Sequence, residues 1–220
     1  MPGRPKKSKV MRKAQSHPYH HGSLREALLE AALALIGRKG SQALSLREVA
    51  RRAGVSQAAP YRHFKSREAL LAAVAEEGFG KMAEEMEAAT ASCRGDPVKS
   101  LEELGVAYVR FAATHPSHFR VMFGSEVAGP GRYPKLEQAS RASFQHLLGG
   151  MEALQAAQVA APAPPLEMAL PAWGLVQGLS SLLVDGRLPG VHAAPGQFSK
   201  DAEMLVRLAA RKLLQGLEKR

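Results

Sequence analysis

The side chains best suited to binding chemistry lie close together in one segment, SLREVARRAGVSQAAPYRHFK, residues 45–65. Its second half carries an amide, a phenol, a guanidinium and an imidazole at Gln57, Tyr61, Arg62 and His63. Such groups form hydrogen bonds or carry positive charge, which suits contacts to base edges and phosphates. The segment therefore indicates nucleic-acid recognition, provided that it folds so as to present these side chains together.

The local sequence predicts two short helices joined by a glycine turn. Ser45 and Glu48 match an S-x-x-E capping box, in which the serine oxygen accepts the Glu48 N–H and the carboxylate reaches back to the Ser45 N–H. Gly54 stands where a chain leaving a helix commonly adopts a positive φ, and Ser56 is expected to cap the second helix. This pattern is typical of a helix-turn-helix, whose second helix enters the DNA major groove. An ordinary helical hairpin is the alternative that spacing alone leaves open.

The charge of the chain is concentrated around this segment. Residues 1–65 hold 14 lysines and arginines against 3 acidic residues, a net charge of +11, whereas residues 66–220 hold 16 against 17, a net charge of −1. A basic end joined to a near-neutral body is typical of a polyanion-binding module attached to a second module. A basic membrane-surface helix would need its charges opposite one strongly apolar face, so nucleic acid is the favoured partner.

The first residues are expected to form an arm rather than a packed element. Residues 1–16 contain six basic residues, no acidic residue and no hydrophobic periodicity, which predicts disorder in isolation. Arg4 and Lys6 could enter an A·T-rich minor groove. A solubilising tail with nonspecific phosphate contacts is the alternative.

A histidine cluster follows the arm. His17, His20 and His21 lie in HPYHHG, but neither cysteine nor carboxylate lies nearby to complete a zinc site. We therefore expect a loop leading into the first helix, and neither a metal nor a cofactor.

The whole chain predicts an all-α protein. Hydrophobic residues recur at helical spacing, separated by glycine- and proline-rich breaks, over six further segments: 23–39, 66–91, 98–114, 135–159, 166–185 and 199–217. We expect four parts: a disordered basic arm over 1–16, a helix-turn-helix domain over 17–65, a connecting helix over 66–91 and a second domain over 92–220.

Other function classes find little support. The chain has no apolar run long enough to span a membrane, and its single cysteine, Cys93, fits a reducing cytoplasm. An enzyme is not expected, because the sequence shows no nucleophile motif, no glycine-rich phosphate loop and no carboxylate pair of defined spacing.

The last two helices are expected to mediate self-association. Small residues share one face of the first, and apolar residues at i, i+3 and i+4 spacing share one face of the second: Gly174, Gly178 and Ser181, then Leu205, Ala209, Leu213 and Leu217. Two helices from each chain could form a four-helix bundle across a two-fold axis. Burial of both helices within their own domain is the alternative.

Residues 23–79 carry a denser pattern, with SLREVARRAGVS at 45–56 and YRHFKSREALL at 61–71. This stretch resembles the TetR/AcrR family of bacterial transcriptional regulators. Trp173 and Gly178, with HPYHHG and AAPYRHF, resemble a subgroup named for Trp-His-Gly, although Gln177 replaces its histidine. Pro60 lies early in the expected second helix, which should begin tightly wound or later than Ser56.

The resemblance implies a homodimeric DNA-binding regulator, most often a repressor, that reads a pseudo-palindromic operator. Ser45, Arg47 and Lys65 would contact phosphates, and Gln57 could pair with adenine and Ala58 with a thymine methyl group. The DNA-binding set is completed by Ser56, Tyr61, Arg62 and His63. A nonspecific or architectural nucleic-acid-binding protein is the alternative function.

The resemblance also implies that the C-terminal domain binds a small-molecule effector. An effector pocket would be mostly apolar with a few polar groups, for which His115 and Gln177 are our candidates. The candidate lining is Tyr108, Phe111, His115, Phe119, Met122, Phe123, Phe144, Met151, Trp173 and Gln177.

Overall fold

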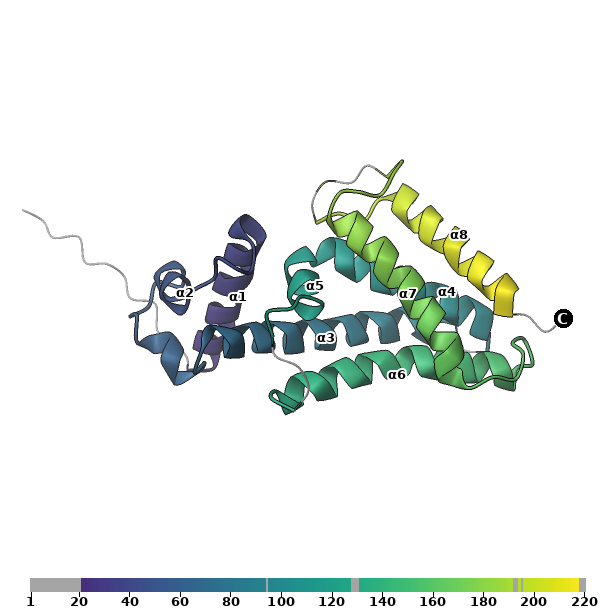
Figure 1. The fold of residues 1–220 in the computed structure, drawn as a ribbon, viewed down its shortest axis with the longest axis horizontal. Coiled ribbons are helices and arrows are strands. Elements are labelled where there is room, and N and C mark those ends of the chain that lie inside the picture. Colours follow the sequence, from purple (N-terminus) through teal and green to yellow (C-terminus); the bar gives the residue numbers. More distant parts are fainter. Residues whose placement is uncertain (1–20, 94, 128–130, 192–193, 195, 218–220) are drawn as a thin grey trace, which may run out of the picture.

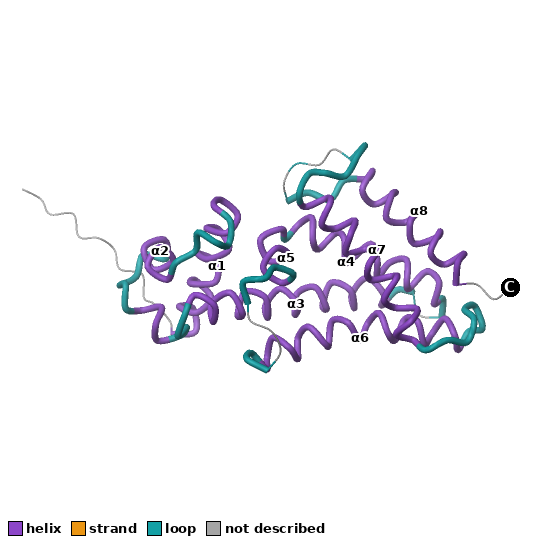
Figure 2. Tube along the Cα trace, in the orientation of Figure 1, coloured by secondary structure: helices purple, strands orange, loops and turns teal. Residues whose placement is uncertain are grey.

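The structure is a computed structural model that describes residues 21–93, 95–127, 131–191, 194 and 196–217. This part of the chain folds into helices joined by loops, which confirms the all-α prediction (Figure 2). The helices are α1 His21–Lys39, α2 Leu46–Arg52, the 3₁₀ helix η1 Ala59–Arg62, α3 Arg67–Ala91, α4 Pro97–Thr114, α5 Pro116–Met122, α6 Pro134–Ala156, α7 Pro165–Val184 and α8 Lys200–Leu217. None of the described helices is both long and apolar enough to cross a membrane.

Two hydrophobic cores share the long helix α3. Leu70, Leu71 and Val74 in its first half are buried with residues of α1 and α2. Phe79 and Met82 in its second half are buried in a larger core with residues of α4, α6, α7 and α8. Figure 1 shows α3 running from the small N-terminal group of helices into the larger C-terminal body. The division into domains remains a prediction.

The ends of the helices follow local chemistry. Ser66 is the N-cap of α3 and accepts a hydrogen bond from the Ala69 N–H at 3.1 Å, which satisfies an otherwise unpaired donor of the first turn. Asp96 plays the same role for α4 by accepting the Lys99 N–H at 2.9 Å. The first helix differs from expectation. It begins at His21, two residues before the predicted segment 23–39.

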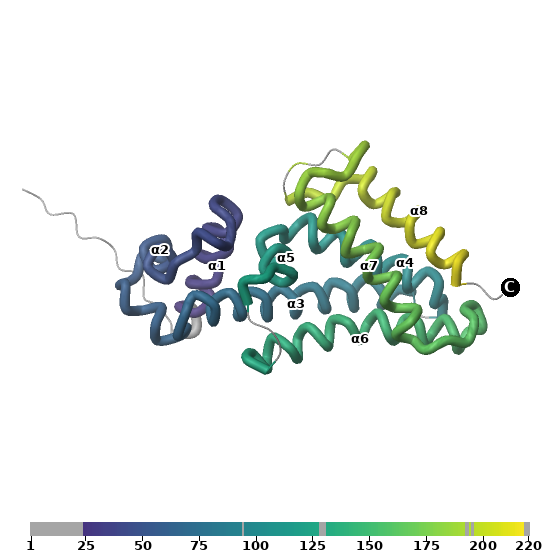
Figure 3. Tube along the Cα trace, viewed as in Figure 1, coloured from purple at the N-terminus to yellow at the C-terminus, as the bar shows by residue number. Residues whose placement is uncertain are grey.

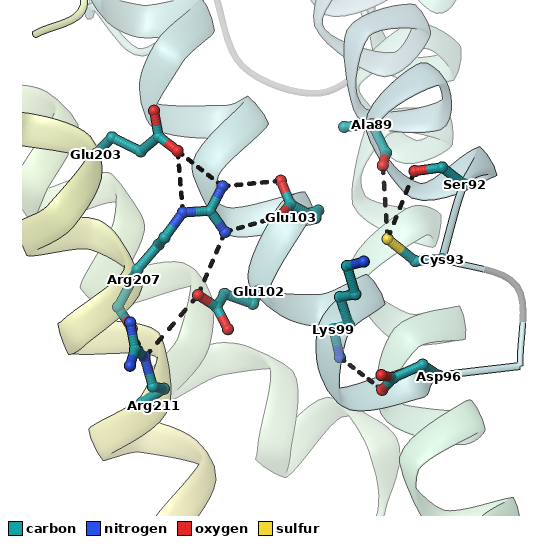
Figure 4. Close-up of polar contacts among 10 residues, drawn as sticks. All are labelled: Ala89, Ser92, Cys93, Asp96, Lys99, Glu102, Glu103, Glu203, Arg207 and Arg211. Carbon is teal, nitrogen blue, oxygen red and sulfur yellow. Dashed lines mark hydrogen bonds and ion pairs between the residues drawn. The ribbon is translucent and has the colours of Figure 1, made fainter. Parts of the chain in front are cut away.

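An ion-pair network of five residues, Glu102, Glu103, Glu203, Arg207 and Arg211, attaches α8 to α4 (Figure 4). The Arg207 guanidinium donates to both oxygens of Glu103, at 2.7 and 3.2 Å, and to Glu203 Oε1 at 2.8 Å. It also reaches Glu102 Oε1 at 3.3 Å. A bidentate guanidinium–carboxylate pair fixes orientation as well as distance, so the network sets which face of α8 meets the body. Figure 3 shows α8 along the outer edge of that body, beside α7.

The short helix α5 lies between the two cores. Its Val121 is buried in the N-terminal core, whereas its Phe119 is buried in the C-terminal core. The close approach of α5 to α3 favours a glycine, because a Cβ atom at Gly78 would lie 2.5 Å from Met122 Sδ and 3.2 Å from His118 Cβ. Gly80, slightly further along the same helix, faces open space.

This difference gives a matched pair of substitutions. Gly80→Ala should raise the free energy of unfolding by about 0.5–1 kcal/mol, since alanine favours the helix and meets no neighbour. Gly78→Ala gains the same helix propensity but must displace the Met122 side chain and press on His118, which costs about 1–3 kcal/mol of overpacking. Urea denaturation of both variants tests the contact, and equal stabilisation by the two alanines would contradict it.

Candidate nucleic-acid interface and ligand cavity

The glycine turn predicted after the first short helix is present with two hydrogen bonds that end the helix. The Val55 N–H donates to the Ala50 carbonyl at 3.0 Å, and the Gly54 N–H donates to the Arg51 carbonyl at 3.3 Å. This is the Schellman pattern, and it requires the φ of +71° that Gly54 adopts. The turn therefore fixes the direction in which the chain leaves α2.

The start of α2 agrees with the prediction in one half of the capping box. Ser45 Oγ accepts the Glu48 N–H at 3.2 Å. The Glu48 carboxylate accepts a hydrogen bond from Lys39 Nζ at 2.9 Å, which ties the end of α1 to α2. That bond lowers the pKa of Glu48 and keeps its carboxylate charged.

Our prediction that Ser56 caps the second short helix is wrong, because the helix begins later and Ser56 is not its cap. It is a 3₁₀ helix over Ala59–Arg62, preceded by Ala58, which makes no side-chain capping bond. Ser56 contributes its carbonyl, which accepts the Ala59 N–H at 3.0 Å. Pro60 explains the change because it has no N–H and tolerates only a first-turn position. We expected Pro60 to make this helix begin tightly wound or later than Ser56, and the 3₁₀ helix that begins at Ala59 agrees with both alternatives.

One side of the 3₁₀ helix packs against the protein interior, and its other side is exposed to solvent. Pro60 is buried, and its carbonyl accepts the N–H groups of His63 and Phe64 at 3.0 and 2.9 Å. Phe64 is 3% exposed, and the Arg25 guanidinium of α1 lies 5.8 Å from its ring centroid. Tyr61, in contrast, is 53% exposed.

The candidate DNA-contacting side chains are gathered on this N-terminal unit. Ser45 is half-buried, and the other described candidates are exposed: Arg47, Ser56, Gln57, Ala58, Tyr61, Arg62, His63 and Lys65. Arg4 and Lys6 lie outside the described residues, as do His17 and His20 of the histidine cluster. Exposed cations beside an amide and a phenol can bind phosphates and base edges together.

A partly open cavity of about 100 Å³ lies in the C-terminal body. Its wall is mostly apolar and is built by helices α3, α4, α6, α7 and α8 together with Phe123. The lining residues are Phe79, Met82, Met86, Leu101, Leu104, Gly105, Tyr108, Phe123, Ser140, Ser143, Phe144, Leu147, Ala172, Trp173, Leu175, Val176, Ala210 and Leu213. Of the ten predicted lining residues, Tyr108, Phe123, Phe144 and Trp173 are among them.

One hydrogen-bonded chain of side chains borders this cavity. Trp173 Nε1–H donates to Tyr108 Oη at 3.3 Å, and the Tyr108 hydroxyl donates to Gln177 Oε1. Burial raises the pKa of Tyr108, so its hydroxyl stays protonated. Gln177 is thus linked to the cavity through its hydrogen bond with Tyr108, which lines the wall.

A larger and more open groove of about 490 Å³ adjoins the cavity. The two share Phe79, Phe123, Ser140 and Trp173, so these four side chains stand between them. Met122, another predicted lining residue, borders only the groove.

The remaining predicted lining residues lie elsewhere. Phe111 and Met151 are fully buried in the core, and Phe119 is nearly so. His115 stacks on Phe111 with ring centroids 4.8 Å apart and lies 3.7 Å from Glu85 Oε1, away from the cavity wall. The sequence therefore identified aromatic residues that are buried in this domain, but it could not distinguish those that line the cavity from those that lie in the hydrophobic core.

The two C-terminal helices expose apolar side chains that the sequence-based prediction did not include. Met204 and Leu208 of α8 are 66% and 52% exposed. On α7, residues at four-residue spacing are exposed in a row: Leu166, Leu170, Gly174, Gly178 and Leu182. Of the other residues predicted to meet a partner, Leu213 and Leu217 pack against the core, and Ser181, Leu205 and Ala209 are half-buried.

His118 occupies the junction between the two cores. It is 4% exposed, and its Nε2 lies 3.4 Å from Glu77 Oε1 of α3. Burial, assisted by the charge of Lys81, lowers the pKa of His118 from 6.5 to about 4 against the opposing effect of Glu77. The imidazole is therefore neutral in the folded chain near neutral pH.

Comparisons with known proteins agree with this geometry. Residues 28–74 match the family model for bacterial regulatory proteins of the tetR family, and residues 101–208 match the tetracyclin repressor-like C-terminal domain. A protein of unknown function from Rhodococcus sp. RHA1 has a similar structure, with 33% identity, a TM-score of 0.78 and coverage of 93% of this chain and 100% of that one. No curated protein sequence matches the chain.

Two more distant structures share the fold. The TetR family transcriptional regulator PfmR from Thermus thermophilus is 22% identical, with a TM-score of 0.65 over 87% of this chain and 99% of that one. The fatty acid degradation regulator FadR from Bacillus halodurans is 16% identical, with a TM-score of 0.68 over 88% and 99%. At these identities the likeness concerns the fold alone.

The buried histidine predicts a pH dependence. Between pH 6.5 and about 4 the unfolded chain binds a proton at residue 118 that the folded chain does not, so stability falls as pH falls through this range. His118→Gln should make the fall shallower, whereas His63→Gln, at an exposed position, should leave it unchanged. Urea denaturation across the range measures this, and equal slopes for His118→Gln and the parent would contradict it.

Proposed function

This chain belongs to the TetR family of bacterial regulatory proteins, and we propose that it binds a pseudo-palindromic DNA operator as a homodimer and is released by a small molecule. In this proposal it acts as a repressor. The observation that carries the proposal is the exposed set of cationic and hydrogen-bonding side chains on and around η1, where the Gly54 turn and the buried Pro60 and Phe64 fix the chain.

The cavity supports the ligand-responsive part of the proposal. Phe79, Met82 and Met86 of its wall belong to α3, whose first half is buried in the DNA-binding unit. A second link joins the two parts, because the Ser41 hydroxyl donates to the Glu126 carboxylate in the loop after α5. A ligand that fits one position of α3 better than another would shift the positions of the two DNA-binding units of the dimer.

The exposed apolar residues of α7 and α8 support the dimeric part. Met204 and Leu208 lie on α8, whose opposite side is buried through Ala202 and Val206. Gly174 and Gly178 have open space where a side chain would stand, so a second backbone can approach α7 closely. We infer that these two helices pack against their copies in a four-helix interface across a two-fold axis.

The DNA surface is tested by removing one cation. Arg47→Ala should weaken operator binding and make the slope of log affinity against log salt shallower, by about 0.9 for each phosphate that the side chain neutralises. Arg187→Ala, at an exposed position after α7, is the control and should leave both quantities unchanged. Fluorescence anisotropy with labelled DNA at several salt concentrations gives the slope. An unchanged slope for Arg47→Ala would remove this residue from the interface.

The dimer interface is tested by placing charge on the exposed apolar face. Leu208→Glu should weaken dimerisation at least about ten-fold, because an unpaired carboxylate would be buried between the helices. Gln138→Glu adds the same charge at an exposed position of α6 and should remain dimeric. Light scattering at micromolar concentration separates the two outcomes, and a monomeric parent protein would refute the interface.

A further inference from the structure

The cavity in the C-terminal body excludes charged ligands. Among the described residues, its wall contains no lysine, arginine, aspartate, glutamate or histidine, and its titratable side chain, Tyr108, remains a neutral phenol. An ionised group in such surroundings would lose its hydration without gaining a partner of opposite charge. A ligand that enters the cavity must therefore be neutral where it is enclosed.

The size of the cavity limits the ligand to a compact one. Its volume of about 100 Å³ is well below the range of about 300–1,000 Å³ typical of drug-sized ligands. It is closer to the engineered apolar cavity of about 150 Å³ that holds benzene. Phe144 and Trp173, whose ring centroids are 6.0 Å apart in an edge-to-face arrangement, provide aromatic walls. A single ring therefore suits this space, with small shifts of flexible neighbours such as Met82 and Met86.

The hydrogen-bonded chain beside the cavity offers a ligand one acceptor, beside the hydroxyls of Ser140 and Ser143 in the same wall. The Trp173 N–H is used by Tyr108 Oη, and the Tyr108 O–H is used by Gln177 Oε1. The donors of Trp173 and Tyr108 are thus already engaged, and Gln177, which keeps its amide N–H groups, is not part of the cavity wall. A phenolic oxygen has two lone pairs, of which Trp173 occupies one, so Tyr108 retains the capacity to accept one more hydrogen bond.

We propose that the cavity binds a neutral, single-ring apolar molecule that carries one hydrogen-bond donor, a hydroxyl or an N–H, which donates to Tyr108 Oη. The identification of this molecule as the effector rests on the function proposed above, whereas its chemical class rests on the wall alone. Gln177 is a positioning residue in this arrangement, because it orients the Tyr108 hydroxyl away from the ligand.

The chain provides its own probe for the test. Trp173 is the only tryptophan in the sequence, and it lines the cavity, so a change in tryptophan fluorescence reports on this site. The full-length protein is titrated, without DNA, with phenol, with its methyl ether anisole and with benzoate. Phenol should bind about three- to ten-fold more tightly than anisole, the factor that one neutral hydrogen bond supports. Benzoate should bind much more weakly than either.

A matched pair of variants assigns the effect to one oxygen atom. Tyr108→Phe should bind phenol and anisole equally, whereas Tyr133→Phe, in the adjoining groove, should keep the preference for phenol. Equal binding of phenol and anisole by the parent protein, tighter binding of benzoate, or no response to phenol would overturn the inference. None of these results depends on DNA binding, so the salt-dependence test of Arg47→Ala can succeed where this one fails.

Discussion

The shared use of α3 by two cores is the constraint on which the rest of the structure depends. Leu70, Leu71 and Val74 of its first half are buried with α1 and α2, the N-terminal group of helices that we call the reading unit. Phe79, Met82 and Met86 of its second half are buried beside the cavity. Displacing either half would expose fully buried side chains, so the helix moves with both parts or with neither. The helix α5 strengthens this constraint, because Val121 and Phe119 belong to different cores and Gly78 lets α5 approach α3 closely. The position of the reading unit therefore follows from the packing of the body.

The reading unit was the part most accessible to prediction, because its determinants are local. The cap at Ser45, the glycine turn at Gly54 and the start of α3 at Ser66 each depend on residues within a few positions along the chain. The shape of the reading helix was less accessible. Ser56 is of a residue type that commonly caps helices. Pro60 makes a regular helix from that position unfavourable, however, and a 3₁₀ turn forms instead. The partner of Glu48 also escaped prediction, because Lys39 lies on another helix.

The cavity and the exposed face of the C-terminal helices could be predicted only in part, because both depend on how helices pack. Periodicity shows that Phe111 and Tyr108 of α4 face inward, but only packing makes one a core residue and the other a wall. Leu213 shows the same limit. Its spacing suited an interface between chains, whereas Arg207 holds α8 so that Leu213 lines the cavity and Met204 and Leu208 remain exposed.

The central claim is that two copies of this chain read DNA together and in a sequence-specific way. The most direct measurement is the selection of binding sites by the full-length protein from a pool of random double-stranded DNA. The account predicts enrichment of one motif with two half-sites related by a two-fold axis, since the operator mirrors the symmetry of the dimer. Recovery of sequences without a shared motif, bound with an affinity that depends only on salt, would contradict it and would identify a nonspecific nucleic-acid-binding protein.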